Sequence, residues 1–112
     1  MSNYSLILNN FSGNGTVVKV DLLNTKKAAL ILRAINHKLR QQMLKMFDEQ
    51  GKMTVTQLYL KLRLEQSVVS QHLAILRKAG LVKTVRNGKF IYYSIHAERL
   101  EELNEFAKNL LN

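Results

Sequence analysis

Two short amphipathic segments with a very short connection between them constrain the fold of this chain more than any other feature. They are predicted as helices over 55–62 and 66–78, and each carries apolar residues at helical spacing: Leu58 and Leu62 in the first, Val69, Leu73 and Leu76 in the second. A separation of about three residues is typical of a helix-turn-helix. The sequence therefore predicts this motif in the middle of the chain.

Local signals mark the two ends of the motif and a hairpin after it. Thr54 and Gln57 match a capping box, in which each side chain accepts from the backbone N–H of the other residue. Gly80 ends the second helix. The segments LVKTVR and KFIYYSI then predict two strands, joined at Asn87-Gly88 because both residues tolerate positive φ. A hairpin in this place predicts a wing beside the helix-turn-helix.

Helical spacing predicts three further helices. One runs from Asn24 or Thr25 to Ile35, a second begins after a break near Asn36-His37 and ends at Gly51, and the last is capped by Ser94 or His96. Before them, YSLIL and TVVKV flank a turn-prone NNFSGNG, which predicts a hairpin or a loosely held arm.

These elements together predict a mostly α (α+β) fold, a winged helix-turn-helix with about five helices and a two-stranded wing. We expect residues 1–21 to form an N-terminal extension. Residues 22–112 are expected to form the winged helix-turn-helix domain, which includes both terminal helices.

Charge is unevenly distributed along the chain. Seventeen Lys and Arg stand against eight Asp and Glu, and neither 66–92 nor 26–47 contains an acidic residue. Such segregation favours a polyanionic partner, although a basic surface that serves only solubility gives the same count. The chain contains no cysteine, which excludes a disulfide framework, a thiolate metal site and a cysteine nucleophile.

Two further function classes find no support in the residues. No arrangement of acidic, histidine or glycine-rich segments resembles a catalytic site, so we expect no enzyme and no cofactor. No run approaches the roughly 18 apolar residues of a membrane span, and the N-terminus lacks the features of a signal peptide. We therefore expect a cytoplasmic protein with no membrane partner.

The second helix of the motif presents short or amide side chains at its beginning. Small polar residues let a helix enter the major groove and bond to base edges, and a valine can touch a thymine methyl group. The residues predicted to read bases are Gln66, Ser67, Val68, Ser70 and Gln71. Taken singly, each has a structural alternative, such as a helix-start residue at Ser67 or a small packing contact at Ser70.

A second group of residues is predicted to contact the DNA backbone. Such contacts fix register without reading sequence. The wing tip contributes Arg86, Asn87, Gly88 and Lys89, and the second helix contributes His72, Arg77 and Lys78. Alternatively, His72 is a half-buried packing residue, and Arg77 and Lys78 are simply solvated.

The run S-x-H-L-x-x-L-x-x-A-G-L-V from Ser70 to Val82, with AINHKLRQQML before it and NGKFIYYSI after it, resembles the ArsR/SmtB family of arsenical-resistance regulators. This resemblance implies a homodimeric, cytosolic bacterial transcription factor, usually a repressor whose DNA affinity falls when an effector binds. It also implies double-stranded DNA with an inverted-repeat operator as the partner.

The family usually forms its dimer interface from the first and last helices, whose broad apolar faces in this chain agree with that role. The residues predicted for the interface are Leu32, Ile35, Leu100, Leu103, Phe106, Ala107 and Leu110. These helices could alternatively complete the core of a monomer. A further alternative is a winged-helix module that docks a protein through its last helix and N-terminal arm, with an incidental basic face.

The sequence departs from the family pattern in several places. The helix TQLYLKL lacks the family's sensor cysteines, and His96 and Glu98 find no complementary ligands near the end of the last helix, so we expect no metal. Arg63 stands where a glycine is common, and Glu65 where a short capping hydroxyl is common. The extension has no family role that can be carried over.

Overall fold

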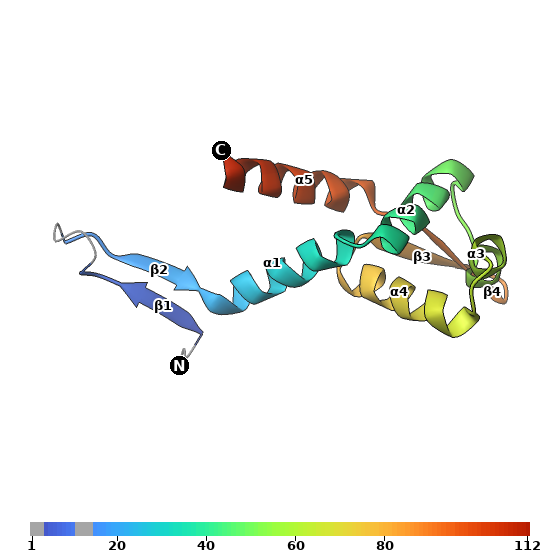
Figure 1. Cartoon of the computed structure of the whole chain (residues 1–112), viewed down its shortest axis with the longest axis horizontal. Helices are drawn as coiled ribbons and strands as arrows, with labels where there is room; N and C mark the ends of the chain where they lie inside the picture. Colours follow the sequence, from blue (N-terminus) through green and yellow to red (C-terminus); the bar gives the residue numbers. More distant parts are fainter. Residues whose placement is uncertain (1–3, 11–14) are drawn as a thin grey trace. The chain divides into compact units, whose positions relative to one another are not determined.

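The computed structural model describes residues 4–10 and 15–112, and this part contains five helices and two antiparallel hairpins (Figure 1). The chain divides into two compact units, one ending at Leu30 and one spanning Ile31–Asn112. The elements are β1 (Ser5–Leu8), β2 (Val18–Asp21), α1 (Leu22–Ile35), α2 (Lys38–Gln50), α3 (Val55–Leu62), α4 (Gln66–Lys78), β3 (Val82–Asn87), β4 (Phe90–Ile95) and α5 (Ala97–Leu111). The predicted mostly helical α+β class is confirmed. The predicted division into 1–21 and 22–112 stays a prediction.

The first unit contains the predicted N-terminal hairpin. Strands β1 and β2 pair in the register Leu6↔Val20 and Leu8↔Val18, and part of the predicted turn between them lies outside the described residues. Helix α1 begins at Leu22, earlier than predicted, because the Asp21 carboxylate accepts from the two N–H groups of Leu23 and Asn24 at 3.0 Å each. The sequence reasoning missed this aspartate cap.

The core of the second unit lies between helices α2, α3 and α4 and the base of the β3–β4 hairpin. Its largest fully buried side chains are Phe47, Met43, Leu58, Leu76, Leu81 and Val69. Both helices of the predicted helix-turn-helix therefore pack the apolar residues that their helical spacing had indicated against this core. Their packing gives α3 and α4 a fixed arrangement in this unit.

The two ends of α3 agree with the features noted in the sequence. The Gln57 N–H donates to the Thr54 hydroxyl at 3.2 Å, and the Thr54 N–H donates to the Gln57 side chain at 2.9 Å, which confirms the capping box. Helix α3 ends at Leu62, and the residue that caps it, Arg63, has a φ of 57°, in the left-handed region. A left-handed residue here explains why a glycine suits this turn.

The wing forms as predicted, but its turn is shifted by one residue. Asn87 pairs with Phe90, so the two-residue loop is Gly88-Lys89 and not Asn87-Gly88. The physical reason is simple. Of the two loop residues only Gly88 takes a positive φ, of 66°, and a type II′ turn needs glycine only at its first central position. The base of the wing is fixed by two backbone hydrogen bonds between Met53 and Tyr93, at 3.0 and 2.7 Å.

Candidate nucleic-acid interface

Helix α4 separates an apolar inner side from a polar outer side. Val69, Leu73 and Leu76 are at most 2% exposed. The five residues predicted to read bases are all exposed: Gln66, Ser67, Val68, Ser70 and Gln71. We call these five residues the recognition face. Because the inner side is packed, this face is presented to solvent in a fixed orientation.

The start of α4 lies directly after the tight turn from α3. The Glu65 carbonyl accepts from the N–H groups of Val68 and Val69, both at 3.2 Å. Glu65 is the N-cap, but its side chain makes no capping hydrogen bond. The recognition face therefore occupies the first turns of an unbroken helix, where a helix that enters the major groove makes its base contacts.

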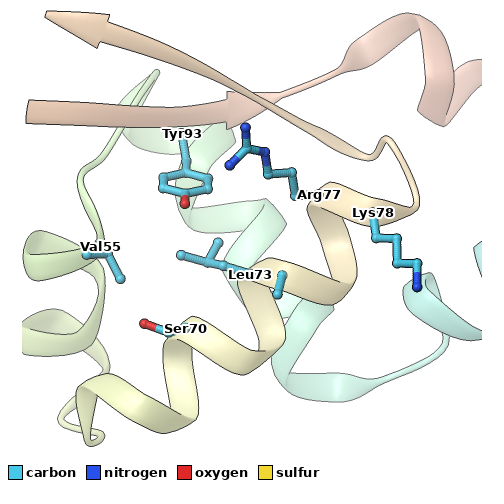
Figure 2. A pocket seen from close by; sticks show the side chains of 7 residues that line it. Val55, Ser70, Leu73, Arg77, Lys78 and Tyr93 are labelled. Atoms are coloured by element: carbon cyan, nitrogen blue, oxygen red, sulfur yellow. The ribbon is translucent and has the colours of Figure 1, made fainter.

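A groove of about 480 Å³ lies between the start of α3, the middle of α4 and strand β4. Its lining residues are Val55, Ser70, Leu73, Ala74, Arg77, Lys78 and Tyr93. Figure 2 shows the Arg77 side chain extending beside the Tyr93 ring, whereas Lys78 points away from the other labelled residues. The two cations that the sequence grouped together are therefore directed differently. Tyr93 was not among the predicted site residues. The alternation of side chains along a strand does not indicate which of them lines a groove against another helix.

The four residues predicted at the wing tip do come together there and are exposed. The Arg86 Nε atom donates to the Gly88 carbonyl at 3.2 Å, which stabilises the turn. The Lys89 Nζ atom lies 5.5 Å from the centre of the Phe90 ring. Arg86 and Lys89 thus carry two positive charges at the exposed end of the hairpin, in reach of a polyanion.

His72 is half-buried, and one of its ring nitrogens points toward the protein interior. Its Nδ1 atom lies 3.1 Å from Nη1 of Arg40, and its ring centre lies 4.8 Å from that of His37. Burial, followed by the positive charges of His37 and Arg40, lowers the pKa of His72 from its ordinary value of 6.5. This placement corresponds to the packing alternative for His72; a DNA-backbone contact through its other nitrogen stays a prediction.

Arg40 differs from the other cations of its segment in being buried. It is 7% exposed and makes hydrogen bonds to the carbonyls of Ala34, at 2.6 Å, and Arg33, at 3.0 Å, in the last turn of α1. No sequence pattern distinguished it from its exposed basic neighbours, since the partners lie on two other helices.

The residues predicted for a dimer interface fall into two groups. Ile35, Leu100 and Leu103 pack partly against the core of their own unit. Phe106 and Leu110, farther along α5, are 46% and 68% exposed. The remaining predicted members, Leu32 and Ala107, are half-buried. No residue of α5 is fully buried, so much of its apolar surface is uncovered in the single chain.

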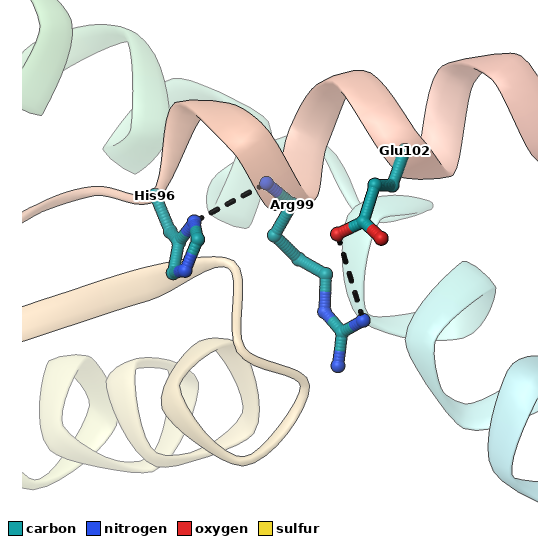
Figure 3. Close-up of polar contacts among 3 residues, drawn as sticks. All are labelled: His96, Arg99 and Glu102. Carbon is teal, nitrogen blue, oxygen red and sulfur yellow. Dashed lines mark hydrogen bonds and ion pairs between the residues drawn. The ribbon is translucent and has the colours of Figure 1, made fainter.

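The beginning of α5 is held by His96, as one of the two predicted caps (Figure 3). Its Nδ1 atom accepts from the Arg99 N–H at 3.2 Å, and its backbone N–H donates to the Leu81 carbonyl at 3.0 Å. Arg99 and Glu102 form an exposed ion pair at 3.9 Å. In the described part of the chain, no three His, Cys, Asp or Glu residues gather in a way that could hold a metal ion.

Comparison with known proteins shows which family has a similar helix-turn-helix and wing. The model of the family described as "Bacterial regulatory protein, arsR family" matches residues 37–84, which span α2, the helix-turn-helix and the start of the wing. An uncharacterized HTH-type transcriptional regulator of Methanocaldococcus jannaschii is 35% identical, over 76% of this chain and 96% of that protein. The transcriptional activator HlyU of Vibrio cholerae is 33% identical, over 78% of this chain and 80% of that protein.

A solved structure supports the same assignment. The transcriptional repressor PagR of Bacillus anthracis has a TM-score of 0.60 at 32% identity, covering 80% of this chain and 98% of that chain. These relatives are regulators of transcription by name and not enzymes. Within residues 4–10 and 15–112, none of the helices has both the length and the apolar character to cross a membrane.

Proposed function

This chain belongs to the arsR family of bacterial regulatory proteins and is a DNA-binding transcriptional regulator, and we propose that it acts in the cytoplasm as a homodimeric repressor of an inverted-repeat operator. The recognition face on α4 carries this proposal. Five exposed, small or amide-bearing residues stand on a helix whose opposite side is sealed in the core. Such a helix fits the major groove and has donors and acceptors for base edges.

In this proposal, phosphate contacts come from the wing and from the last turn of α4. Arg86 and Lys89 hold the sugar-phosphate backbone at the wing tip, with the backbone of Asn87 and Gly88 between them. Arg77 and Lys78 make further backbone contacts from α4. These residues supply affinity and register, and the recognition face supplies sequence discrimination.

The homodimer in this proposal uses the apolar surface of α5 together with α1. Exposed Phe106 and Leu110 would be covered by the partner, and the residues nearer the core would extend the interface. Two linked α4 helices can then address half-sites one DNA turn apart, which makes the operator symmetric. Relatives include both a repressor and an activator by name, and repression is the direction that we propose.

Selection of bound sequences from random DNA duplexes tests the central claim. We expect an inverted repeat to be recovered, and we expect its affinity to fall linearly with salt on a log–log scale. Recovery of no preferred sequence would reject sequence-specific binding. Recovery of a single unrepeated half-site would reject the symmetric dimer alone.

One substitution tests the recognition face directly. Gln71→Ala should reduce discrimination against mismatched operators by about 1 kcal/mol or more per half-site, because a glutamine can bond to a base edge in two places. Gln42→Ala is the matched control, since Gln42 is an exposed glutamine on helix α2. Equal discrimination by the two variants would show that Gln71 reads no base.

The alternative function, docking of another protein through α5, uses the same exposed apolar side chains. The two functions differ in their response to salt. Binding through apolar helices should not weaken steeply as salt rises, whereas binding to DNA phosphates should. A titration of the selected duplex against salt therefore separates them.

A further inference from the structure

A buried arginine connects the helix that carries the recognition face to the end of helix α1. Arg40 of α2 is 7% exposed, and its guanidinium donates to the Ala34 carbonyl at 2.6 Å, to the Arg33 carbonyl at 3.0 Å and to His72 Nδ1 at 3.1 Å. The two carbonyls lie in the last turn of α1, where backbone acceptors have no partner within the helix. A cation is also favoured at that end of a helix by the macrodipole.

The contact with His72 fixes the protonation of its imidazole. An arginine side chain can only donate, so Nδ1 must accept, and the single ring proton must sit on Nε2. Arg40 forms no ion pair with a carboxylate among the described residues. The ion pair found there joins Arg99 to Glu102. A buried guanidinium without a carboxylate depends on neutral acceptors such as these, and losing one of them is costly.

The position of His72 in α4 makes this contact relevant to DNA binding. It directly follows Ser70 and Gln71 of the recognition face, and it precedes the buried Leu73. A movement of His72 relative to Arg40 therefore also moves the residues that face DNA. Shifts of about 1 Å in a positioned group are enough to weaken directional contacts.

We propose that Arg40 is a positioning residue, which holds the recognition face in its DNA-binding orientation through neutral His72, and that protonation of His72 releases this connection and weakens operator binding. The proposal rests on the DNA-binding role of α4 given above. A doubly protonated imidazole would present an N–H to the guanidinium, so an acceptor would be replaced by a donor and two positive charges would lie in contact. His37, whose ring lies against that of His72, is the third group that can carry positive charge at this point.

The direction of the pH response separates this role from a phosphate contact. A histidine that contacts DNA phosphate binds more tightly when it is charged, so acidification would strengthen binding. Added positive charge elsewhere on the protein would act in the same direction. If His72 must stay neutral to accept from Arg40, acidification weakens binding. The pKa of His72 in the folded protein is already lowered by burial and by its neighbours His37 and Arg40.

The test measures affinity of the full-length protein for the duplex recovered by selection, at constant salt, by fluorescence anisotropy. We expect wild-type affinity to fall severalfold between about pH 7.5 and about pH 5.5, because protonation of His72 opposes binding and its ordinary pKa lies in this range. His72→Asn places an oxygen that does not titrate near the position of Nδ1. This variant should bind as wild type does at the higher pH and should lose most of the pH response.

Two matched controls use the remaining histidines, since the chain contains three. His96→Asn and His37→Asn each keep a side chain that can cap a helix, at α5 and α2 respectively. His96→Asn should retain the response unchanged. His37→Asn should retain a response whose midpoint lies at higher pH, because one of the groups that lowers the pKa of His72 is removed. If the response survives in His72→Asn, or disappears in His37→Asn alone, the connection through His72 is wrong.

Variants of Arg40 test whether its planar guanidinium, which donates to three acceptors, is required. Arg40→Lys keeps the charge but cannot reach three acceptors in one plane, so it should weaken binding at the higher pH by about tenfold. Full affinity in this variant would show that charge alone suffices. Specific wild-type binding that tightens on acidification would overturn this proposal only, whereas absence of specific binding at any pH would overturn the proposed function.

Discussion

Replacement of Lys89 by glutamine at the wing tip offers the most quantitative test of the proposed phosphate contacts. Lys89 is exposed in the loop between β3 and β4, and its Nζ atom lies 5.5 Å from the Phe90 ring centre. The substitution keeps a polar side chain of similar length and removes one charge per protomer. The fold should be unaffected, because the residue makes no buried contact.

The magnitude can be calculated from counterion release. Each phosphate contact contributes about 0.9 to the slope of log affinity against log salt, so the loss of two contacts per dimer should lower the slope by about 1.8. Over a fourfold rise in salt, from about 50 to about 200 mM, wild-type affinity should therefore fall about twelvefold more than that of the variant. Anisotropy titrations of the selected operator at four or five salt concentrations measure this difference.

A control separates a local contact from the general effect of net charge. Lys45→Gln removes the same charge from an exposed position on α2, which is not assigned to the DNA interface. We expect its slope to stay close to that of wild type. If Lys45→Gln and Lys89→Gln change the slope equally, Lys89 does not contact a phosphate and the assignment of the wing tip to the DNA backbone fails.

Three further predictions concern stability and assembly. Arg63→Gly should raise the free energy of unfolding by about 1 kcal/mol, because φ at this position is left-handed, and Arg63→Ala should give no such gain; thermal unfolding compares them. Leu110→Ser should raise the dimer dissociation constant measured by sedimentation, since Leu110 is 68% exposed in the single chain and is proposed to be covered by the partner; an unchanged constant would exclude it from the interface. Because the pKa of His72 is lowered in the folded protein, its neutral form should contribute fully to the free energy of unfolding above the ordinary pKa of 6.5. This contribution should be lost progressively as pH falls from that value toward the folded-state pKa. Denaturant titrations should show the loss in wild type and a smaller loss in His72→Asn.

The parts of the fold that the sequence predicted correctly are those determined by neighbouring residues. Apolar spacing at Val69, Leu73 and Leu76 requires only that one side of a helix be buried, whatever covers it. The capping box of Thr54 and Gln57 is likewise local, since both partners lie within one helical turn. These signals predicted α3 and α4 closely enough to identify the recognition face.

Errors arose where two local solutions were nearly equivalent. Asn87-Gly88 and Gly88-Lys89 can both form a two-residue hairpin loop, and each places glycine in a position that allows positive φ. The choice depends on the strand register, in which Val82 pairs with Ile95 and Met53 adds a bridge to Tyr93. Since Met53 lies before α3, no local pattern could have identified the correct loop.

Arg40 shows a different limit of sequence reasoning, and it concerns function more than fold. Residues 26–47 contain six Lys and Arg residues, which the helical pattern of the sequence does not distinguish from one another. Arg40 alone among these six is buried. Its acceptors are backbone carbonyls of α1 and a ring nitrogen of α4, which carry no residue-type signature toward an arginine. A buried cation without a carboxylate must be satisfied in this way, and each acceptor then becomes sensitive to its own protonation state. His72 is the only one of these three acceptors that titrates, so any pH sensitivity in this contact must enter through the helix that presents the recognition face.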